Sequence, residues 1–246
     1  MYLKLDEGLY LIGSGLYGLS NWKDCSVYLI TDGYHSGIID CGAGMDDELI
    51  YRNFLETGIA PETVEYLFLT HAHGDHAGGA VGLKQYFVNA KIVTSAEEAE
   101  LLENGSDEEL GLVMAKAKGA YPPDYAYRHT SADLIVVDGQ KMILGKMEVE
   151  MLVVPGHTSG SVLYLFSKDE KAYLFCGDYI FLRGVIGLLN CPGSSLEGFR
   201  KSLPRVAQMQ IDALLPGHRE FALRNAQRFL EMAAKNIIST TLPPVM

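Results

Sequence analysis

The sequence predicts an α/β (α+β) protein built as a four-layer αββα sandwich, with two sheets between outer layers of helices. Strand-like and helix-like segments alternate up to Thr94, and a second run of such segments follows residue 145, as expected of two similar halves. The chain has 246 residues, of which 48% are hydrophobic, enough for one substantial core. No linker or low-complexity stretch interrupts it. We therefore predict one domain over residues 1–246.

The first half opens with apolar segments separated by turns that contain Gly and Asn. We expect strands at residues 8–12, 25–31, 36–39, 64–69 and 91–94, and helices at 46–57 and 79–87. The first helix has apolar residues spaced on one face. It ends at Gly58 with Pro61 beyond it, which are ordinary stop signals.

Residues 95–130 follow a different pattern and are predicted to form a helical and aromatic insertion. Ser95-x-x-Glu98 and Ser106-x-x-Glu109 are capping-box patterns, each of which is expected to open a helix. A loop rich in tyrosine and proline follows, at residues 119–129. Long irregular segments inside compact domains are usually functional. We interpret the loop as a lid or pocket wall; a packed crossover between the halves is the alternative.

The second half again alternates strands and helices. Asp138-Gly139 is a hairpin signal between strands expected at 133–137 and 141–144. Further strands are expected at 147–154, 161–166, 172–176 and 211–215, with helices at 195–210 and 223–238. Pro204 is expected to kink or divide the first of these helices.

Composition excludes some classes of partner. Lys and Arg number 20 against 31 Asp and Glu, a net charge of −11, and no Lys/Arg run is present. Nucleic acid is therefore not an expected partner. No apolar run could span a bilayer and no secretory signal is visible, so we expect a cytoplasmic protein. The four cysteines show no close pairing and are expected to be reduced thiols. The oligomeric state is left open.

A cluster of potential metal ligands follows the strand at 64–69. A stretch of six residues in a glycine-rich loop contains four of them, His71, His73, Asp75 and His76. Imidazole and carboxylate groups bind zinc, iron and manganese, and crowding four of them without a cation is unfavourable. The loop therefore predicts a metal site.

One cluster rarely completes such a site, and further candidates occur after three other apolar strands. His157 follows Pro155-Gly156, Asp178 follows Gly177, and His218 follows Pro216-Gly217. The candidate metal ligands are thus His71, His73, Asp75, His76, His157, Asp178 and His218. His35, in a turn, and His129, which no strand delivers to the site, are not expected to be ligands.

Two loops are candidate pocket segments beside these ligands. One is the loop at 119–129, and the other is the glycine-containing segment 179–195 that follows Asp178. The residues predicted to contact substrate are Tyr121, Tyr125, Tyr127, Tyr179 and Arg183.

Four motifs resemble those of the metallo-β-lactamase superfamily and, within it, of glyoxalase II-like metallohydrolases. They are His71-x-His73-x-Asp75-His76, Pro155-Gly156-His157-Thr158-Ser159-Gly160, Gly177-Asp178 and Pro216-Gly217-His218. The resemblance spans nearly the whole chain and implies a dinuclear site for two divalent metal ions, zinc first, with iron or manganese as alternatives. It implies that His71, His73 and His157 hold one metal, that Asp75, His76 and His218 hold the second, and that Asp178 bridges them.

The resemblance also implies a role for Asp40. Relatives carry an aspartate after the third strand that hydrogen-bonds the metal loop, so Asp40 is expected to hold a ligating histidine in position. A plain turn aspartate is the alternative. The segment after His218 is expected to be too short for the helical domain with which relatives hold glutathione, and residues 179–184 depart from their usual continuation. Both departures argue against hydroxyacylglutathione as the substrate.

The activity that the resemblance implies is that of a metal-dependent hydrolase. It would cleave an ester-like bond in a small molecule, a thioester first and a lactone next, through a metal-bridging hydroxide. Asp75 or Asp178 would orient the nucleophile, and no G-x-S-x-G motif is present. The main alternative is a persulfide dioxygenase-like oxidoreductase with one non-haem iron on His71, His157 and Asp178. Phosphodiester hydrolysis and a metal-binding scaffold without turnover are further alternatives.

Overall fold

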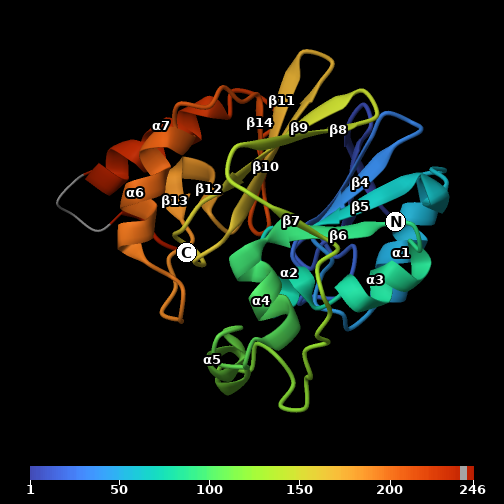
Figure 1. Cartoon of the computed structure of the whole chain (residues 1–246), viewed down its shortest axis with the longest axis horizontal. Coiled ribbons are helices and arrows are strands. Elements are labelled where there is room, and N and C mark those ends of the chain that lie inside the picture. The colour runs from blue at the N-terminus through green and yellow to red at the C-terminus, as the bar shows by residue number, and fades with distance from the viewer. Residues whose placement is uncertain (239–242) are drawn as a thin grey trace. The chain divides into compact units, whose positions relative to one another are not determined.

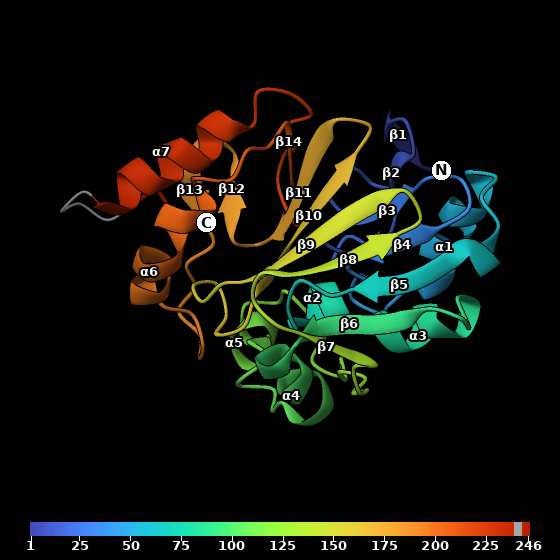
Figure 2. The ribbon, with the colours of Figure 1, turned by 45° about the horizontal axis from the view of Figure 1, so that its top comes forward.

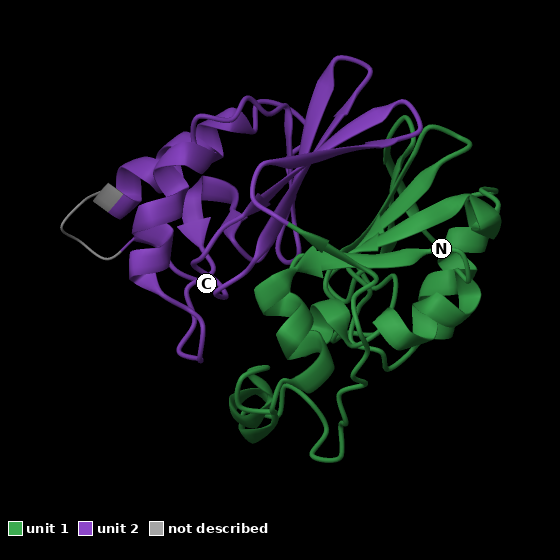
Figure 3. Ribbon diagram, viewed as in Figure 1, with its two compact units in different colours: residues 1–136 green, residues 137–246 purple. Residues whose placement is uncertain are grey.

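The computed structural model of the protein describes residues 1–238 and 243–246 (Figure 1). The chain divides into two compact units, Met1–Val136 and Val137–Met246, which we call unit 1 and unit 2 (Figure 3). Two halves were expected from the alternation of strands and helices, and the boundary lies somewhat before residue 145. The assignment of one domain to the whole chain stays a prediction.

Unit 1, whose residues are all described, contains a seven-stranded sheet in the order β1-β2-β3-β4-β5-β6-β7. The strands are β1 (Leu3–Asp6), β2 (Leu9–Gly13), β3 (Val27–Thr31), β4 (Ser36–Ile39), β5 (Val64–Phe68), β6 (Lys91–Ser95) and β7 (Leu134–Val136). Neighbours from β1 to β4 pair antiparallel, and neighbours from β4 to β7 pair parallel. The carboxyl ends of β4, β5 and β6 therefore lie at one edge of the sheet.

The helices of unit 1 are α1 (Asp47–Glu56), α2 (Gly74–Ala77), α3 (Ala80–Tyr86), α4 (Ala96–Asn104) and α5 (Leu112–Ala117), with a 3₁₀ turn at Pro61–Thr63. Helix α1 packs on β2 and α3, and α4 packs on β6 and β7. Phe54 of α1 and Phe87 meet edge to face in the core, with ring centroids 4.8 Å apart. These contacts bury the apolar faces that the sequence pattern indicates.

The two predicted capping boxes have different outcomes. Ser95 caps α4, since its Oγ accepts the Glu98 N–H at 3.3 Å, which confirms the first. Ser106 and Glu109 also exchange hydrogen bonds, but turns follow them and α5 begins only at Leu112. The second helix prediction is wrong because Gly111, with φ of +71°, breaks the helical backbone just before α5.

Within residues 137–238 and 243–246, unit 2 holds a five-stranded sheet in the order β14-β11-β10-β9-β8 and a two-stranded sheet. The strands are β8 (Gln140–Leu144), β9 (Met147–Val153), β10 (Val162–Lys168), β11 (Lys171–Gly177), β12 (Ile180–Phe181), β13 (Val185–Ile186) and β14 (Ala213–Pro216). Neighbours from β8 to β11 pair antiparallel, whereas β11 and β14 pair parallel. The carboxyl ends of β11 and β14 are therefore adjacent, with Gly177 opposite Pro216.

The predicted hairpin around Asp138-Gly139 is wrong. Strand β7 pairs with β6 in unit 1, while β8 pairs with β9 in unit 2. Asp138 does form a turn, but its carboxylate accepts hydrogen bonds from the Val153 N–H and from the guanidinium of Arg205. The turn signal is real, and it marks the change from one sheet to the other.

The helices of unit 2 are α6 (Leu196–Val206) and α7 (Gln227–Ile238), with a 3₁₀ turn at Leu182–Gly184. They pack against each other (Figure 2). Pro204 lies inside the last turns of α6, which ends at Val206 and not at residue 210. No helix formed by the described residues is long and apolar enough to cross a lipid bilayer.

Candidate metal centre

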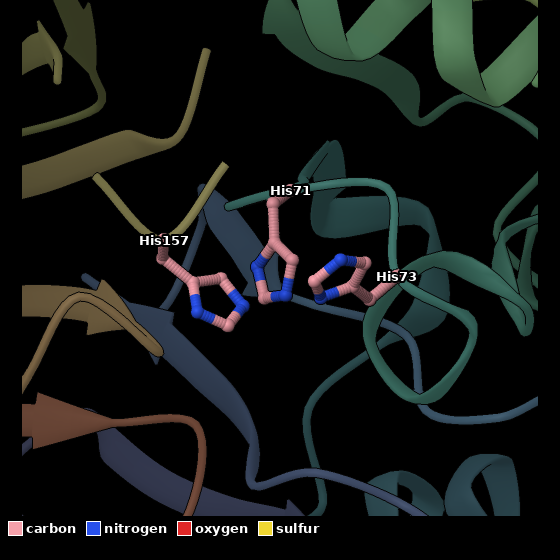
Figure 4. A group of neighbouring side chains, drawn as sticks. All are labelled: His71, His73 and His157. Atoms are coloured by element: carbon pink, nitrogen blue, oxygen red, sulfur yellow. The ribbon is translucent and has the colours of Figure 1, made fainter. Parts of the chain in front are cut away.

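The loop after β5 brings together the four candidate ligands of unit 1. His71 and His76 are fully buried, and His73 is 8% exposed. The ring centroids of His71 and His73 lie 4.7 Å apart, and those of His71 and His76 lie 4.0 Å apart. Figure 4 shows the imidazoles of His71 and His73 on this loop. The side chain of Asp75 is 27% exposed, so it remains accessible to water.

The backbone explains why these side chains converge. The carbonyl of His73 accepts the N–H groups of His76 and Ala77 and so starts the single turn of α2. The carbonyl of His76 accepts the Cys41 N–H at 2.7 Å, which ties α2 to the end of β4. A Cβ added to Gly79 would lie 2.0 Å from the Cys41 carbonyl oxygen. The glycine-rich sequence is thus required for this close approach.

Asp40 hydrogen-bonds the loop from the end of β4. Its carboxylate accepts the Thr70 N–H at 2.8 Å and the Thr70 hydroxyl at 2.9 Å. The same carboxylate accepts the His76 Nδ1–H at 2.8 Å. Neutral imidazole protonated at Nδ1 presents its lone pair at Nε2, so Asp40 selects the ring nitrogen that His76 offers to a cation. The resemblance implied this kind of contact for Asp40.

Unit 2 supplies a second set of candidate ligands. His157, drawn in Figure 4, follows β9, and its Nδ1–H donates to the Gly187 carbonyl oxygen at 2.6 Å. Asp178 follows β11 and His218 follows β14, and the Gly217 N–H donates to the Gly177 carbonyl at 2.8 Å. The Asp178 Oδ2 lies 3.9 Å from Nε2 of His157 and 3.6 Å from Nε2 of His218.

The donor chemistry and spacing of this second set fit a divalent cation. Ligands around one tetrahedral zinc stand about 3.3 Å apart, because each bond to nitrogen or oxygen is about 2.0–2.1 Å long. The distances from Asp178 to the two imidazoles are slightly longer than this value and too long for good hydrogen bonds. The oxygen of Asp178 and the nitrogens of His157 and His218 thus form a set of donors that suits a metal ion.

One group within unit 1 has ligand-type residues but suits a metal poorly. Cys25, Asp40 and His76 have ligand atoms within 4.8 Å of one another. Burial raises the pKa of the Cys25 thiol to about 12, which disfavours the thiolate form that binds metals. The Nδ1 of His76 is already bonded to Asp40. We interpret this group as contacts that hold the metal loop in place, and not as a separate metal site.

The predicted substrate-contact tyrosines of residues 119–129 are largely packed. Tyr121 and Tyr127 are buried in the core of unit 1. The Tyr125 hydroxyl donates to the Ala43 carbonyl at 2.8 Å, and Arg128 donates to Asp47 at 2.6 Å and to the Gly78 carbonyl at 3.2 Å. These bonds favour the packed alternative over a lid.

The two predicted contacts in the segment after Asp178 lie in different environments. Tyr179 is fully buried against Phe199, and its hydroxyl bonds Ser202 at 2.5 Å. Arg183 is exposed, with a φ of +64°. Substrate contact by either residue stays a prediction.

Sequence reasoning missed two residues beside the loop in unit 1. Glu98, which the capping pattern explains, is 1% exposed and accepts the Ala72 N–H at 2.8 Å. Lys23 places its ammonium over the indole of Trp22, 3.2 Å from the ring centroid. Burial lowers the pKa of Lys23, and the charge of Asp75 opposes this shift. No sequence motif marks Lys23. The burial of Glu98 in α4 becomes a signal only once the fold is known.

The family assignment follows from a comparison with protein families. The family model described as "Metallo-beta-lactamase superfamily" matches residues 20–218, a range that contains all seven candidate ligands. The chain belongs to the metallo-β-lactamase superfamily. The resemblance inferred from the four motifs is thereby confirmed.

Relatives within the metallo-β-lactamase superfamily include two curated hydrolases. The human protein named acyl-coenzyme A thioesterase MBLAC2 is 26% identical over 95% of this chain and 85% of its own length. The hydroxyacylglutathione hydrolase of Yersinia pestis is 29% identical over 85% of this chain and 67% of its own. Superfamily relatives of this kind are metal-dependent hydrolases.

Solved metallo-β-lactamase structures share the fold. The metallo-β-lactamase of Cronobacter sakazakii matches with a TM-score of 0.69 and 23% identity, covering 88% of this chain and 77% of its own. The structure of SMB-1 bound to 2-mercaptoethanesulfonate matches with a TM-score of 0.70 and 19% identity, covering 96% and 93%. The predicted αββα fold class of the metallo-β-lactamase type is confirmed.

Proposed function

We propose that the protein is a dinuclear metallohydrolase that cleaves a thioester in a small molecule. The ligand sets of both units would bind a pair of divalent metal ions, with zinc as the first candidate. His71, His73 and His157 would hold one ion, Asp75, His76 and His218 the other, and Asp178 would bridge them. The observation that carries the proposal is the pair of hydrogen bonds from Nδ1 of His76 to Asp40 and from Nδ1 of His157 to Gly187. Each of these bonds presents Nε2 as a ligand atom.

The names of the relatives support a thioester as the substrate class. One relative is named for hydrolysis of acyl-coenzyme A and the other for hydrolysis of hydroxyacylglutathione. Both substrates join an acyl group to a thiol. Metallo-β-lactamases share the fold at lower identity, and fold alone does not decide substrate.

Asp75 and the imidazoles of the site would have different roles in thioester hydrolysis. When bound, two divalent cations supply a water of lowered pKa and polarise an acyl carbonyl. Asp75, which is partly exposed, would orient the attacking water and accept its proton. The imidazoles, held at fixed orientation by Asp40 and Gly187, would keep the site arranged while the thiolate departs.

Metal analysis combined with a substrate panel tests this function. Purified protein should contain about two divalent metal ions per chain and hydrolyse thioesters faster than lactones, β-lactams or phosphodiesters. His71→Ala and Asp178→Ala should each abolish hydrolysis and lower metal content. Two histidines outside the site serve as controls: His35 bonds Glu65 and His129 bonds the Leu102 carbonyl.

Two outcomes would contradict the proposal. His35→Ala and His129→Ala should keep wild-type turnover and metal content, and full turnover in His71→Ala or Asp178→Ala would overturn the site. One iron per chain together with persulfide-dependent oxygen uptake would replace the hydrolase with the dioxygenase alternative.

We further propose the cytoplasm as the location. Cys25, Cys41, Cys176 and Cys191 form no disulfide bond. Cysteines outside disulfides are usual in a reducing compartment. Detection of the native protein in a cytosolic fraction would test this.

A further inference from the structure

Glu98 places its carboxyl group in the interior of unit 1, next to the metal loop. The residue is 1% exposed, and its Oε2 accepts the Ala72 N–H at 2.8 Å. Ala72 lies between His71 and His73, the two histidines that the proposed function assigns to one metal. A buried carboxylate carries a large desolvation cost unless it is well bonded, so this contact requires an explanation beyond helix capping.

The fold brings Glu98 to Ala72 through the junction of β6 and α4. Strand β6 lies beside β5, and Ser95 caps α4 so that the first turn of the helix starts at the edge where the metal loop begins. Just before the cap, the Thr94 hydroxyl donates to the Leu69 carbonyl at 3.1 Å. Thr94 and Glu98 thus bond the backbone of the loop at Leu69 and again at Ala72.

This arrangement is the counterpart of the one at Asp40. Asp40 follows β4, on one side of β5, and bonds Thr70 and His76. Glu98 follows β6, on the other side of β5, and bonds Ala72. The loop is therefore bonded by one buried carboxylate from each strand that flanks β5.

We propose that Glu98 is a positioning residue for the metal centre. Side chains two residues apart in an extended segment point to the same side of the backbone, so His71 and His73 share a direction only while Ala72 keeps its conformation. The bond from the Ala72 N–H to Glu98 holds that conformation. Glu98 acts on the metal centre through its hydrogen bond to the Ala72 N–H and not through a negative charge. This role rests on the proposed metal function of His71 and His73.

Two conservative variants separate the bond from the charge. Glu98→Gln keeps the length of the side chain and an acceptor oxygen but removes the charge. Glu98→Asp keeps the charge but is too short by one methylene to reach Ala72. Glu97→Gln is the matched control, because Glu97 is the preceding residue of α4 and is exposed.

The measurement is cobalt binding to the full-length protein, by chelator competition and by the visible absorption of bound Co²⁺. Glu98→Asp should raise the cobalt dissociation constant by about tenfold or more and change the absorption bands, as loss of a group that orients a ligand does. Glu98→Gln and Glu97→Gln should stay within about threefold of wild type, with its spectrum, on the same principle. Thermal unfolding of the metal-depleted proteins reports any purely structural effect.

Each other result overturns the role. Wild-type affinity and spectrum in Glu98→Asp, with a lowered unfolding temperature, would make Glu98 structural only. Weaker binding in Glu98→Gln than in Glu98→Asp would assign the effect to charge. A wild-type chain that binds no cobalt would overturn the metal centre itself, which is a different failure from the first two.

Discussion

His157 and Gly187 are joined by a hydrogen bond of 2.6 Å from Nδ1 of the imidazole to the glycine carbonyl oxygen. A Cβ added to Gly187 would lie 1.7 Å from the Asp178 carbonyl oxygen and 3.1 Å from Nδ1 of His157. The absence of a side chain at Gly187 is therefore a condition for the placement of two candidate ligands. The neutral imidazole must carry its proton at Nδ1 to make this bond, which leaves the Nε2 lone pair as the metal donor.

The first prediction concerns Gly187→Ala. The added methyl group must displace the backbone at Asp178, and the His157 bond should lengthen or break. We expect metal affinity to fall by about tenfold to a hundredfold, the usual effect of losing a group that orients a ligand. Chelator competition measures this. Asn190→Ala, on an exposed position of the same segment, should match wild type, and equal affinity in both variants would contradict the argument.

The second prediction concerns Asp40→Asn. Asp40 has a φ of +59°, a conformation that asparagine also tolerates. The substitution therefore keeps the backbone and removes the charge that faces the His76 Nδ1–H. Metal affinity and hydrolysis should each fall by about tenfold or more, with little change in unfolding temperature. Metal content and thioesterase rates test this against Asp46→Asn, an exposed neighbour; unchanged metal content would reduce Asp40 to a turn residue.

The sequence predicts the strands around the site well because each carries a clear local signal. The run at 64–69, the strand at 36–39 and the glycines before Asp178 and His218 combine buried apolar segments with turn formers. Local signals do not report which strand pairs with which. The segment 133–137 has the pattern of a hairpin strand, yet its β-strand, Leu134–Val136, pairs with β6. Sheet partners are decided by contacts between distant residues, which periodicity does not contain.

The candidate ligands stand out in the sequence, whereas the residues that hydrogen-bond them are marked there only in part. His71 and its neighbours are a recognisable pattern, and resemblance pointed to Asp40. Glu98 has a sufficient local explanation as a capping residue, so its bond to Ala72 emerges only from the parallel pairing of β5 and β6. Gly187 looks like any loop glycine until the position of Asp178 is known.

The third prediction separates a packed loop from a lid at residues 119–129. Burial raises the pKa of the Tyr125 hydroxyl, which remains a donor to the Ala43 carbonyl. Tyr125→Phe should lower the free energy of unfolding by about 1 kcal/mol, the typical net value of one hydrogen bond. The KM for a thioester should stay at its wild-type value. Urea unfolding and steady-state kinetics test this, with Tyr34→Phe at an exposed turn as the control. A raised KM at unchanged stability would favour the lid.

The fourth prediction concerns the pH dependence of stability. Burial raises the pKa of Asp24 from 3.8 to about 6, so the fold favours the protonated carboxyl. Its stabilising contribution is fully present below about pH 4 and is lost as pH rises through about 6. At 1.36 kcal/mol per pKa unit this amounts to about 3 kcal/mol. Asp24→Asn keeps an oxygen for the Ala43 N–H and cannot ionise.

The corresponding experiment compares two variants over a range of pH. Relative to wild type, Asp24→Asn should be more stable at pH 7.5 than at pH 4 in urea unfolding. Asp124→Asn, at an exposed position, should show no such trend. A stability difference between Asp24→Asn and wild type that is constant with pH would mean that Asp24 does not titrate in this interval.

The fifth prediction concerns Lys23 and the thiol part of the substrate. The chain carries a net charge of −11, yet the Lys23 ammonium lies over Trp22, 5.9 Å from the ring centroid of Tyr121, and interacts with the charge of Asp75. Coenzyme A and glutathione are both anionic thiols. If Lys23 attracts that charge, Lys23→Ala should raise the KM for such thioesters by about fivefold, or about 1 kcal/mol, with kcat unchanged.

Three controls test this role of Lys23. Lys23→Arg should restore the KM, and added salt should weaken the effect of Lys23→Ala. Lys118→Ala, at an exposed lysine of unit 1, should leave the KM unchanged. An equal rise in KM for an uncharged thioester would show that Lys23 acts on the acyl group or on the fold, and not on the charge of the thiol.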